Sequence, residues 1–182
     1  MAEQVVEIQA DQFEESVLKG GKVALDFYST ECPPCEALAP KYEALSSIYG
    51  EDVSFVKIFR QGNRELAEEL GVTSSPTILF YENGVLRETR LSGGIKRSDL
   101  AGELDGMVGP DRTTELRSRV KPIETTCDAV VLGGGPAGLT AAIYLAQAHV
   151  DTIVVDPKLP GGYVATTHQV SNYPGFVEAQ PG

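Results

Sequence analysis

The chain has few of the residues that build disulfide frameworks and metal centres. It contains three cysteines and two histidines among 182 residues, and three cysteines are too few for the disulfide framework of a small secreted fold. Cys32 and Cys35 could supply two ligands to zinc, but a structural zinc site needs four. The other candidates, Cys127, His149 and His168, lie far away in the sequence. We therefore expect no metal site.

Long apolar runs and positive charge are also scarce. No segment approaches the roughly 18 apolar residues of a membrane span, and Met1–Gln4 lacks the basic flank and apolar stretch of a secretory signal. We therefore expect a cytoplasmic protein without a membrane partner. The chain holds 15 Lys and Arg against 26 Asp and Glu, a net charge of −11. Because nucleic-acid binding needs clustered basic side chains, we expect no nucleic-acid partner.

Apolar runs and helical periodicity alternate over residues 1–107 and predict an α/β fold, a mixed sheet flanked by helices. Lys22–Tyr28 is apolar apart from its ends and Asp26, as in a strand buried on both faces. Asn63 is placed to cap a helix, and Asn83-Gly84 favours a tight hairpin turn. The expected strands are 5–8, 22–28, 53–59, 76–81 and 85–91, and the expected helices are 11–18, one beginning at about Pro33, 63–70 and 98–107.

The chain changes character after the last of these helices. Residues 108–125 are polar, contain two prolines and predict a linker. A second unit is expected over 126–182. It has an apolar strand at 129–132, a glycine-rich turn, a helix to about His149 and a strand at 152–155 that ends at Asp156. This order predicts an incomplete Rossmann-like βαβ segment.

The spacing of Cys32 and Cys35 is typical of thiol–disulfide exchange. A strand that ends near Ser29 and feeds a helix puts Cys32 at the helix N-terminus, where unpaired N–H groups and the helix dipole favour an anion. A thiolate is the nucleophile in disulfide chemistry. Cys35, one helical turn further on, is close enough to attack a mixed disulfide and release the product. We therefore expect Cys32 to be the attacking thiol and Cys35 its resolving partner.

Residues 1–107 resemble the thioredoxin family. The matching features are the strand before the Cys-x-x-Cys, Pro40 in the following helix, Ser75-Pro76-Thr77 at the start of a strand, the Asn83-Gly84 turn and the pair Gly93-Gly94. The resemblance implies a thioredoxin fold and protein-disulfide reductase activity on protein disulfide substrates.

The resemblance also implies roles for residues around the two cysteines. Asp26 matches the family's buried carboxylate, which accepts the proton of Cys35, and Lys57 matches the lysine beside it. Pro76 matches the cis proline that packs against the disulfide. Ser75 is expected to offer backbone hydrogen bonds to an extended substrate peptide, and Gly93 to border that peptide. Independently, a carboxylate in an apolar strand should have a raised pKa, which suits a proton acceptor.

Three residues around the cysteine pair depart from the family pattern. Glu31 stands where the family usually has Trp, Pro33 where it has Gly, and Glu36 where it has Lys. The two carboxylates oppose the helix dipole and should raise the pKa of Cys32. Since reduction potentials of Cys-x-x-Cys proteins span roughly 150 mV, the motif leaves the direction of electron flow open.

A glycine-rich turn, Gly133-Gly134-Gly135-Pro136-Ala137-Gly138, follows the strand at 129–132 and opens a helix. Asp156 ends the next strand. This context is typical of dinucleotide binding: glycines allow the tight turn and the close approach of the pyrophosphate, and the carboxylate binds the ribose. The expected binding residues are Gly133, Gly135, Pro136, Ala137, Gly138 and Asp156.

The segment that follows resembles the flavin-binding start of bacterial-type thioredoxin reductases over about 126–178. The resemblance rests on Gly161-Gly162 and Asn172-Tyr173-Pro174-Gly175, with Tyr163 where the family usually has glutamine. It implies FAD as cofactor, held also by Gly162 and Asn172. The rest of that reductase, including its NADPH domain, is absent from the chain. We therefore expect a piece of a longer thioredoxin–reductase fusion that binds NADPH only through the missing domain.

Three functions stay open on the sequence alone. In the first, the flavin reductase domain, in cis or in trans, passes electrons from NADPH via FAD to the thioredoxin module, serving electron transport and cell redox homeostasis. In the second, the flow is reversed and the module is a disulfide oxidase or isomerase. In the third, the flavin-like segment is a docking remnant that binds no flavin.

Overall fold

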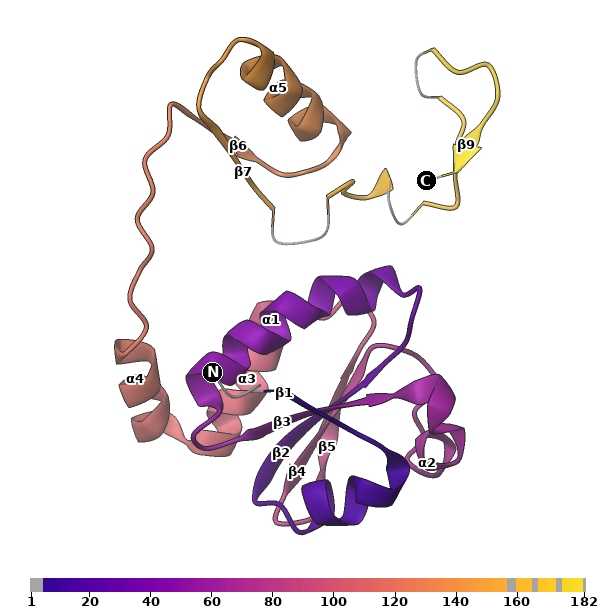
Figure 1. The fold of residues 1–182 in the computed structure, drawn as a ribbon, viewed down its shortest axis with the longest axis vertical. Helices are drawn as coiled ribbons and strands as arrows, with labels where there is room; N and C mark the ends of the chain where they lie inside the picture. The colour runs from indigo at the N-terminus through magenta and orange to yellow at the C-terminus, as the bar shows by residue number, and fades with distance from the viewer. Residues whose placement is uncertain (1–4, 157–159, 165–166, 173–174, 182) are drawn as a thin grey trace. The chain divides into compact units, whose positions relative to one another are not determined.

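The strand β2 (Lys22–Tyr28) lies at the centre of a five-stranded sheet with the order β1-β3-β2-β4-β5 (Figure 1). The computed structural model describes residues 5–156, 160–164, 167–172 and 175–181. Contacts divide the chain into two units, Met1–Pro122 and Ile123–Gly182, and the sheet belongs to the first. β2 pairs with β3 in parallel and with β4 in antiparallel orientation, so the sheet is mixed, as predicted.

The elements of the first unit follow the predicted order closely. The strands are β1 (Val5–Ile8), β2, β3 (Ser54–Phe59), β4 (Thr77–Glu82) and β5 (Val85–Ser92). The helices are η1 (Ala10–Gln12), η2 (Glu14–Leu18), α1 (Pro33–Tyr49), η3 (Arg60–Gly62), α2 (Arg64–Glu69), α3 (Arg97–Val108) and α4 (Pro110–Ser118). Asn83 and Gly84 both have positive φ angles, of 51° and 79°, as the tight hairpin turn between β4 and β5 requires.

Two apolar clusters cover the two faces of this sheet. One joins the sheet to α1, α3 and α4 and contains Ala24, Phe55 and Leu104. The other joins it to η2 and α2 and contains Val17, Leu25 and Ala67. Because side chains alternate along a strand, Ala24 and Asp26 point to the face that α1 covers.

Asn63 occupies the N-cap position of α2, as predicted, but its side chain does not form the cap. Its side chain makes no capping hydrogen bond. The carbonyl oxygen of the amide instead accepts a hydrogen bond from the Ala10 N–H at 2.8 Å, and its NH₂ donates to Gln9 and to the Phe59 carbonyl. The side chain is buried and ties two loops together, which satisfies its polar atoms better than a helix end would.

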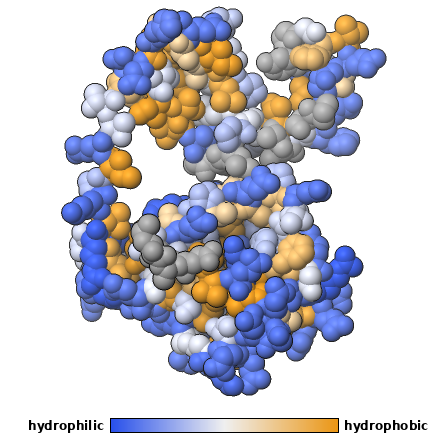
Figure 2. Space-filling view, viewed as in Figure 1, coloured by the Kyte–Doolittle hydropathy of each residue, from blue (hydrophilic) through white to orange (hydrophobic). Residues whose placement is uncertain are grey.

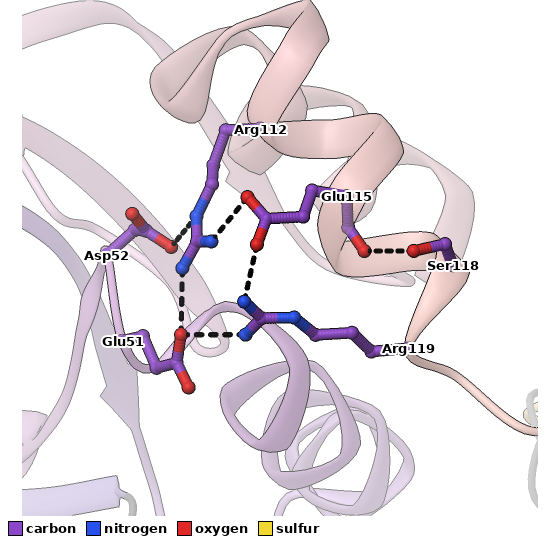
Figure 3. Close-up of polar contacts among 6 residues, drawn as sticks. All are labelled: Glu51, Asp52, Arg112, Glu115, Ser118 and Arg119. Carbon is purple, nitrogen blue, oxygen red and sulfur yellow. Dashed lines mark hydrogen bonds and ion pairs between the residues drawn. The ribbon is translucent and has the colours of Figure 1, made fainter.

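The linker expected over 108–125 differs from the structure in its first half. Residues 110–118 form the helix α4, which Pro110 begins and which buries Leu116 in the cluster beside α1 and α3. Arg112 donates from Nε to Asp52 and from Nη2 to Glu51, both at 2.8 Å, and from Nη1 to Glu115 at 2.7 Å (Figure 3). Arg119 also donates to Glu51 at 2.9 Å, and Arg117 pairs with Asp105. The composition of this segment does not predict the helix, because Leu116 is its one buried apolar side chain and the other contacts are ion pairs with distant residues.

Leu116→Ala is expected to lower the free energy of unfolding of the first unit by about 3 kcal/mol, because it leaves a cavity in a packed cluster. Leu116 is only 2% exposed. Urea unfolding followed by the near-ultraviolet circular dichroism of the buried tyrosines measures the change. The control is Val120→Ala, since Val120 is 47% exposed just beyond α4. Equal stability of the two variants would contradict the assignment of α4 to the first unit.

The second unit is a small βαβ arrangement. It contains β6 (Ala129–Leu132), α5 (Pro136–Gln147) and β7 (Thr152–Val155), with β6 and β7 paired in parallel, and a further pair β8 (Gln169–Val170) and β9 (Gln180–Pro181). Hydrophobic side chains reach its surface (Figure 2), among them Leu132 at 82% and Tyr144 at 67% exposure. The parallel pair and its crossover helix agree with the predicted partial Rossmann-like segment.

Within the described residues, none of the helices combines the length and the apolar character needed to cross a membrane.

Candidate functional site

Cys32 and Cys35 form a disulfide where β2 runs into α1. Their Cα atoms are 5.2 Å apart. Cys32 is the residue before α1, and its Sγ accepts a hydrogen bond from the Cys35 N–H at 3.3 Å. Pro33 and Pro34 occupy the first helical positions, where a missing N–H leaves no intrahelical bond unmade. Cys32 is half-buried and Cys35 is buried, so of the two cysteines Cys32 is the one open to a substrate.

The segment before β4 borders this disulfide. The Ser75–Pro76 peptide bond is cis, and the Ser75 carbonyl oxygen lies 3.6 Å from Cys32 Sγ. The Gly93 N–H, at the end of β5, donates to the Pro76 carbonyl at 3.1 Å. The structure therefore places Ser75 beside Cys32, with Pro76 next in the chain and Gly93 hydrogen-bonded to Pro76.

Asp26 is a buried carboxylate on the face of β2 that α1 covers. It is 7% exposed, and its Oδ1 has no hydrogen-bond partner among the described residues. Burial in an apolar surrounding raises the pKa of Asp26 to about 7, and the charge of Lys57 acts weakly in the opposite direction. Asp26 can therefore exchange a proton near neutral pH.

Lys57 lies beside Asp26 in the sheet but forms its ion pair elsewhere. It is the register partner of Asp26 on one side and of Glu7 on the other. Its Nζ lies 3.6 Å from Glu7 Oε2 and 5.8 Å from the centre of the Tyr28 ring. The charge of Lys57 thus compensates Glu7 directly and Asp26 only at a distance, which is consistent with the raised pKa of Asp26.

Two polar residues at this site are absent from the sequence-based set. Ser29 Oγ lies 2.7 Å from Ser75 Oγ, and Arg60 donates from Nε to Ser75 Oγ at 3.0 Å and from Nη1 to the Thr73 carbonyl at 3.3 Å. The one local signal for Arg60 is its place directly after the apolar strand β3. Its contact with Ser75 spans fifteen residues and cannot be derived from that position.

The glycine-rich turn of the second unit is held by close backbone contacts. Gly133 has a φ of +100°, and a Cβ on Gly138 would lie 1.9 Å from the Gly133 carbonyl oxygen. Only glycine allows α5 to begin this close to the end of β6. The Gly134 N–H donates to the Asp156 carboxylate, and the Gly161 N–H donates to the Gly134 carbonyl at 2.7 Å.

The structure thus gathers most of the predicted cofactor-binding residues around one turn. Gly135 precedes α5 and Pro136 is its first residue, so the helix N-terminus opens at the turn. A Cβ on Gly162 would lie 3.0 Å from the Gly135 Cα, a close backbone approach like that of Gly138. These features fit a dinucleotide cradle, in which glycine backbone and a helix N-terminus face a pyrophosphate. Asn172 is exposed and lies outside these elements, and Tyr173 and Pro174 lie outside the described residues.

Comparisons with known proteins separate the chain into the same two parts. The family model named Thioredoxin matches residues 4–106, and the model of an FAD binding domain matches residues 128–168. The chain is 41% identical over 106 residues to the F-type chloroplastic thioredoxin of Brassica napus, covering 56% of each protein. It is 45% identical over 53 residues to the thioredoxin reductase of Bacillus subtilis, covering 29% of the chain and 17% of the reductase.

A solved structure agrees with the first of these matches. The thioredoxin of Malassezia sympodialis superposes with a TM-score of 0.52 at 29% identity, covering 58% of the chain and 91% of that protein. The chain therefore spans 56% of the length of the plant thioredoxin and 17% of the length of the reductase. These matches confirm the two resemblances inferred from the sequence.

Proposed function

Because the chain belongs to the thioredoxin family, we propose that residues 1–107 are a thiol–disulfide oxidoreductase domain that reduces protein disulfides. The observation that carries the proposal is the Cys32–Cys35 disulfide at the start of α1, beside Ser75 and Pro76. The half-buried Cys32 and the buried Cys35 support unequal roles for the two thiols.

In this mechanism, the Cys32 thiolate attacks one sulfur of a substrate disulfide. A bond forms between Cys32 Sγ and that sulfur, and the other substrate sulfur leaves as a thiolate. Cys35 then loses its proton to Asp26 and attacks Cys32 Sγ. The mixed disulfide breaks, the second substrate sulfur leaves as a thiolate, and the Cys32–Cys35 disulfide has formed. Two electrons have passed from the domain to the substrate.

The roles of the surrounding residues follow from their positions. The pKa of Asp26, about 7, supports its role as proton acceptor, because an acceptor works best when its pKa is near the working pH. Lys57 moderates this pKa by its charge. Backbone groups of Ser75 would bind an extended substrate peptide next to Cys32, with Pro76 and Gly93 forming the wall beside it.

The chain is expected to accelerate the reduction of insulin by dithiothreitol, measured as the turbidity of the precipitating insulin B chain. Dithiothreitol supplies the electrons and returns the Cys32–Cys35 disulfide to the dithiol. A rate equal to that of dithiothreitol alone would refute the reductase. The reverse function, as an oxidase or isomerase, would be favoured by a measured reduction potential near −120 mV instead of about −270 mV.

For the second unit, we propose that residues 126–182 are part of an FAD-binding reductase domain that supplies electrons to the first domain, with residues 119–125 between them. The glycine turn and the N-terminus of α5 would hold the pyrophosphate, and Asp156 the ribose. FAD, when bound, supplies two-electron transfer from a nicotinamide to a disulfide. NADPH would bind to a domain that the chain does not contain.

FAD added to the purified chain is expected to stay bound through gel filtration and to show the visible absorption bands of a protein-held flavin. Asp156→Asn should weaken binding about tenfold, the effect of losing one hydrogen bond to a charged group. The matched control is Asp151→Asn, since Asp151 lies at the opposite end of β7. Equal binding by the two variants would contradict the role of Asp156, and no binding by the wild type would favour a docking remnant.

A further inference from the structure

The guanidinium of Arg60 contacts Ser75, the residue that in turn contacts Cys32 of the disulfide. Arg60 is the first residue after β3, and its two hydrogen bonds go to the segment that borders Cys32, from Nε to Ser75 Oγ at 3.0 Å and from Nη1 to the Thr73 carbonyl at 3.3 Å. The carbonyl of the same Ser75 lies 3.6 Å from Cys32 Sγ. Ser29 Oγ lies 2.7 Å from the same Ser75 Oγ.

The charge of Arg60 is not compensated within the described part of the chain. Both of its acceptors are neutral oxygens. The ion pairs among the described residues involve other cations, namely Lys19, Lys57, Arg87, Arg112, Arg117 and Arg119. An arginine stays protonated in proteins and has five N–H donors, of which these two bonds use two. The half-buried Arg60 therefore presents a full positive charge and further donors.

Arg60 is a positive charge in a unit whose charged residues are mostly acidic. Residues 1–110 hold 19 acidic and 10 basic side chains, and the two charged residues next to the cysteines, Glu31 and Glu36, are exposed carboxylates. Glu31 directly precedes Cys32 and Glu36 lies in the first turn of α1, whereas Arg60 is hydrogen-bonded to Ser75. The residues around Cys32 thus include both carboxylates and a guanidinium.

We propose that Arg60 is a specificity-determining residue that selects peptide disulfides with an acidic side chain next to the reacting cysteine. The proposal rests on the proposed reductase function. A planar guanidinium suits the carboxylate of an acidic side chain, because two parallel N–H groups match its two oxygens. The hydrogen bonds to Ser75 and Thr73 fix the side chain in advance, so a substrate carboxylate orders less of the protein when it binds.

Four symmetrical peptide disulfides test the proposal, each with Glu or Lys directly before or directly after the single cysteine. The measurement is kcat/KM for each peptide, with dithiothreitol as electron donor, and the readout is the Glu-to-Lys ratio at each flank. The variants are Arg60→Gln, Arg60→Glu and Arg60→Lys. The matched control is Arg87→Ala, because Arg87 is also half-buried but pairs with Glu82 at the far end of β4.

At one flank, Arg60→Gln is expected to lower the Glu-to-Lys ratio about fivefold, and Arg60→Glu about twentyfold, as for one partly exposed charge pair lost or reversed. Arg60→Lys should keep the ratio within about threefold of the wild type, because it retains the charge. Arg87→Ala should leave it unchanged. In the wild-type chain, the ratio at that flank should also fall as salt screens the pair, a measurement that needs no variant.

Two outcomes distinguish a failure of the proposed role of Arg60 from a failure of the proposed reductase function. If the wild type reduces the peptides and the ratios in Arg60→Gln and Arg60→Glu equal that of the wild type at both flanks, Arg60 selects nothing and the reductase stands. If the wild type reduces none of the four peptides and no insulin, the reductase itself fails. A ratio that does not change with salt in the wild type also overturns the role of Arg60.

Discussion

Cys32→Ser is expected to abolish the catalysed reduction of insulin. The hydroxyl of serine cannot form a mixed disulfide, and no other thiol stands at the entrance to this helix, since Cys35 is only 8% exposed. Losing a covalent nucleophile typically costs an enzyme a factor of about a thousand or more. The turbidity of insulin with dithiothreitol should then follow the uncatalysed time course.

The matched control is Cys127→Ser. Cys127 is half-buried and lies in the second unit, where its thiol donates to the Ala129 carbonyl at 3.2 Å. This variant should keep the wild-type rate within about twofold, because Cys127 belongs to the other unit and a conservative substitution outside a site usually has a small effect. If Cys32→Ser retained the rate, or if Cys127→Ser lost it equally, the assignment of Cys32 as the attacking thiol would be wrong.

Asp26→Asn is expected to change the pH dependence of stability by about 4 kcal/mol. The pKa of Asp26 rises from an ordinary 3.8 to about 7 in the folded chain, and each unit corresponds to about 1.4 kcal/mol. Below pH 4 the carboxyl is protonated in both the folded and the unfolded state, so burying it does not lower the free energy of unfolding through ionisation. As the pH rises through 4 to 7, the unfolded state ionises first, so the wild type progressively loses stability. Above pH 7 the wild type has lost the full amount, about 4 kcal/mol, of its free energy of unfolding.

Urea unfolding at pH 4 and pH 8, in the oxidised protein, measures this effect. The free energy of unfolding of Asp26→Asn relative to the wild type should rise by about 4 kcal/mol between the two pH values. Asp11→Asn is the control, because Asp11 is exposed, and should leave the pH dependence unchanged. A constant difference between Asp26→Asn and the wild type at both pH values would show that Asp26 ionises normally in the folded state.

The sequence predicts much of this fold because the patterns are local. The burial of Lys22–Tyr28 can be inferred from its composition, and Asn83-Gly84 specifies its own turn through the φ angles that both residues tolerate. The strands Ala129–Leu132 and Thr152–Val155 have the predicted bounds. In each case, the residues that determine the structure lie within the element itself.

Where the predictions differ from the structure, the deciding contacts are distant in sequence. Asn63 precedes its helix as predicted, but its side chain bonds to Gln9 and Ala10, more than fifty residues earlier, instead of to the first turn of the helix. α4 is attached through Arg112 and Arg119, which bond to Glu51 and Asp52 about sixty residues earlier. Arg60 reaches the site through Ser75. No periodicity or spacing encodes such pairings, because each depends on which loops the finished sheet brings together.

The attachment of α4 also sets the length of the flexible tether between the thioredoxin part and the second unit. Without α4, the segment between α3 and β6 would run over 109–128, up to about 70 Å when extended. With α4 attached and Arg119 hydrogen-bonded to Glu51, the segment before β6 shortens to 120–128, up to about 30 Å. Because effective concentration falls roughly as the −3/2 power of tether length, the shorter tether raises the effective concentration of one unit around the other about threefold.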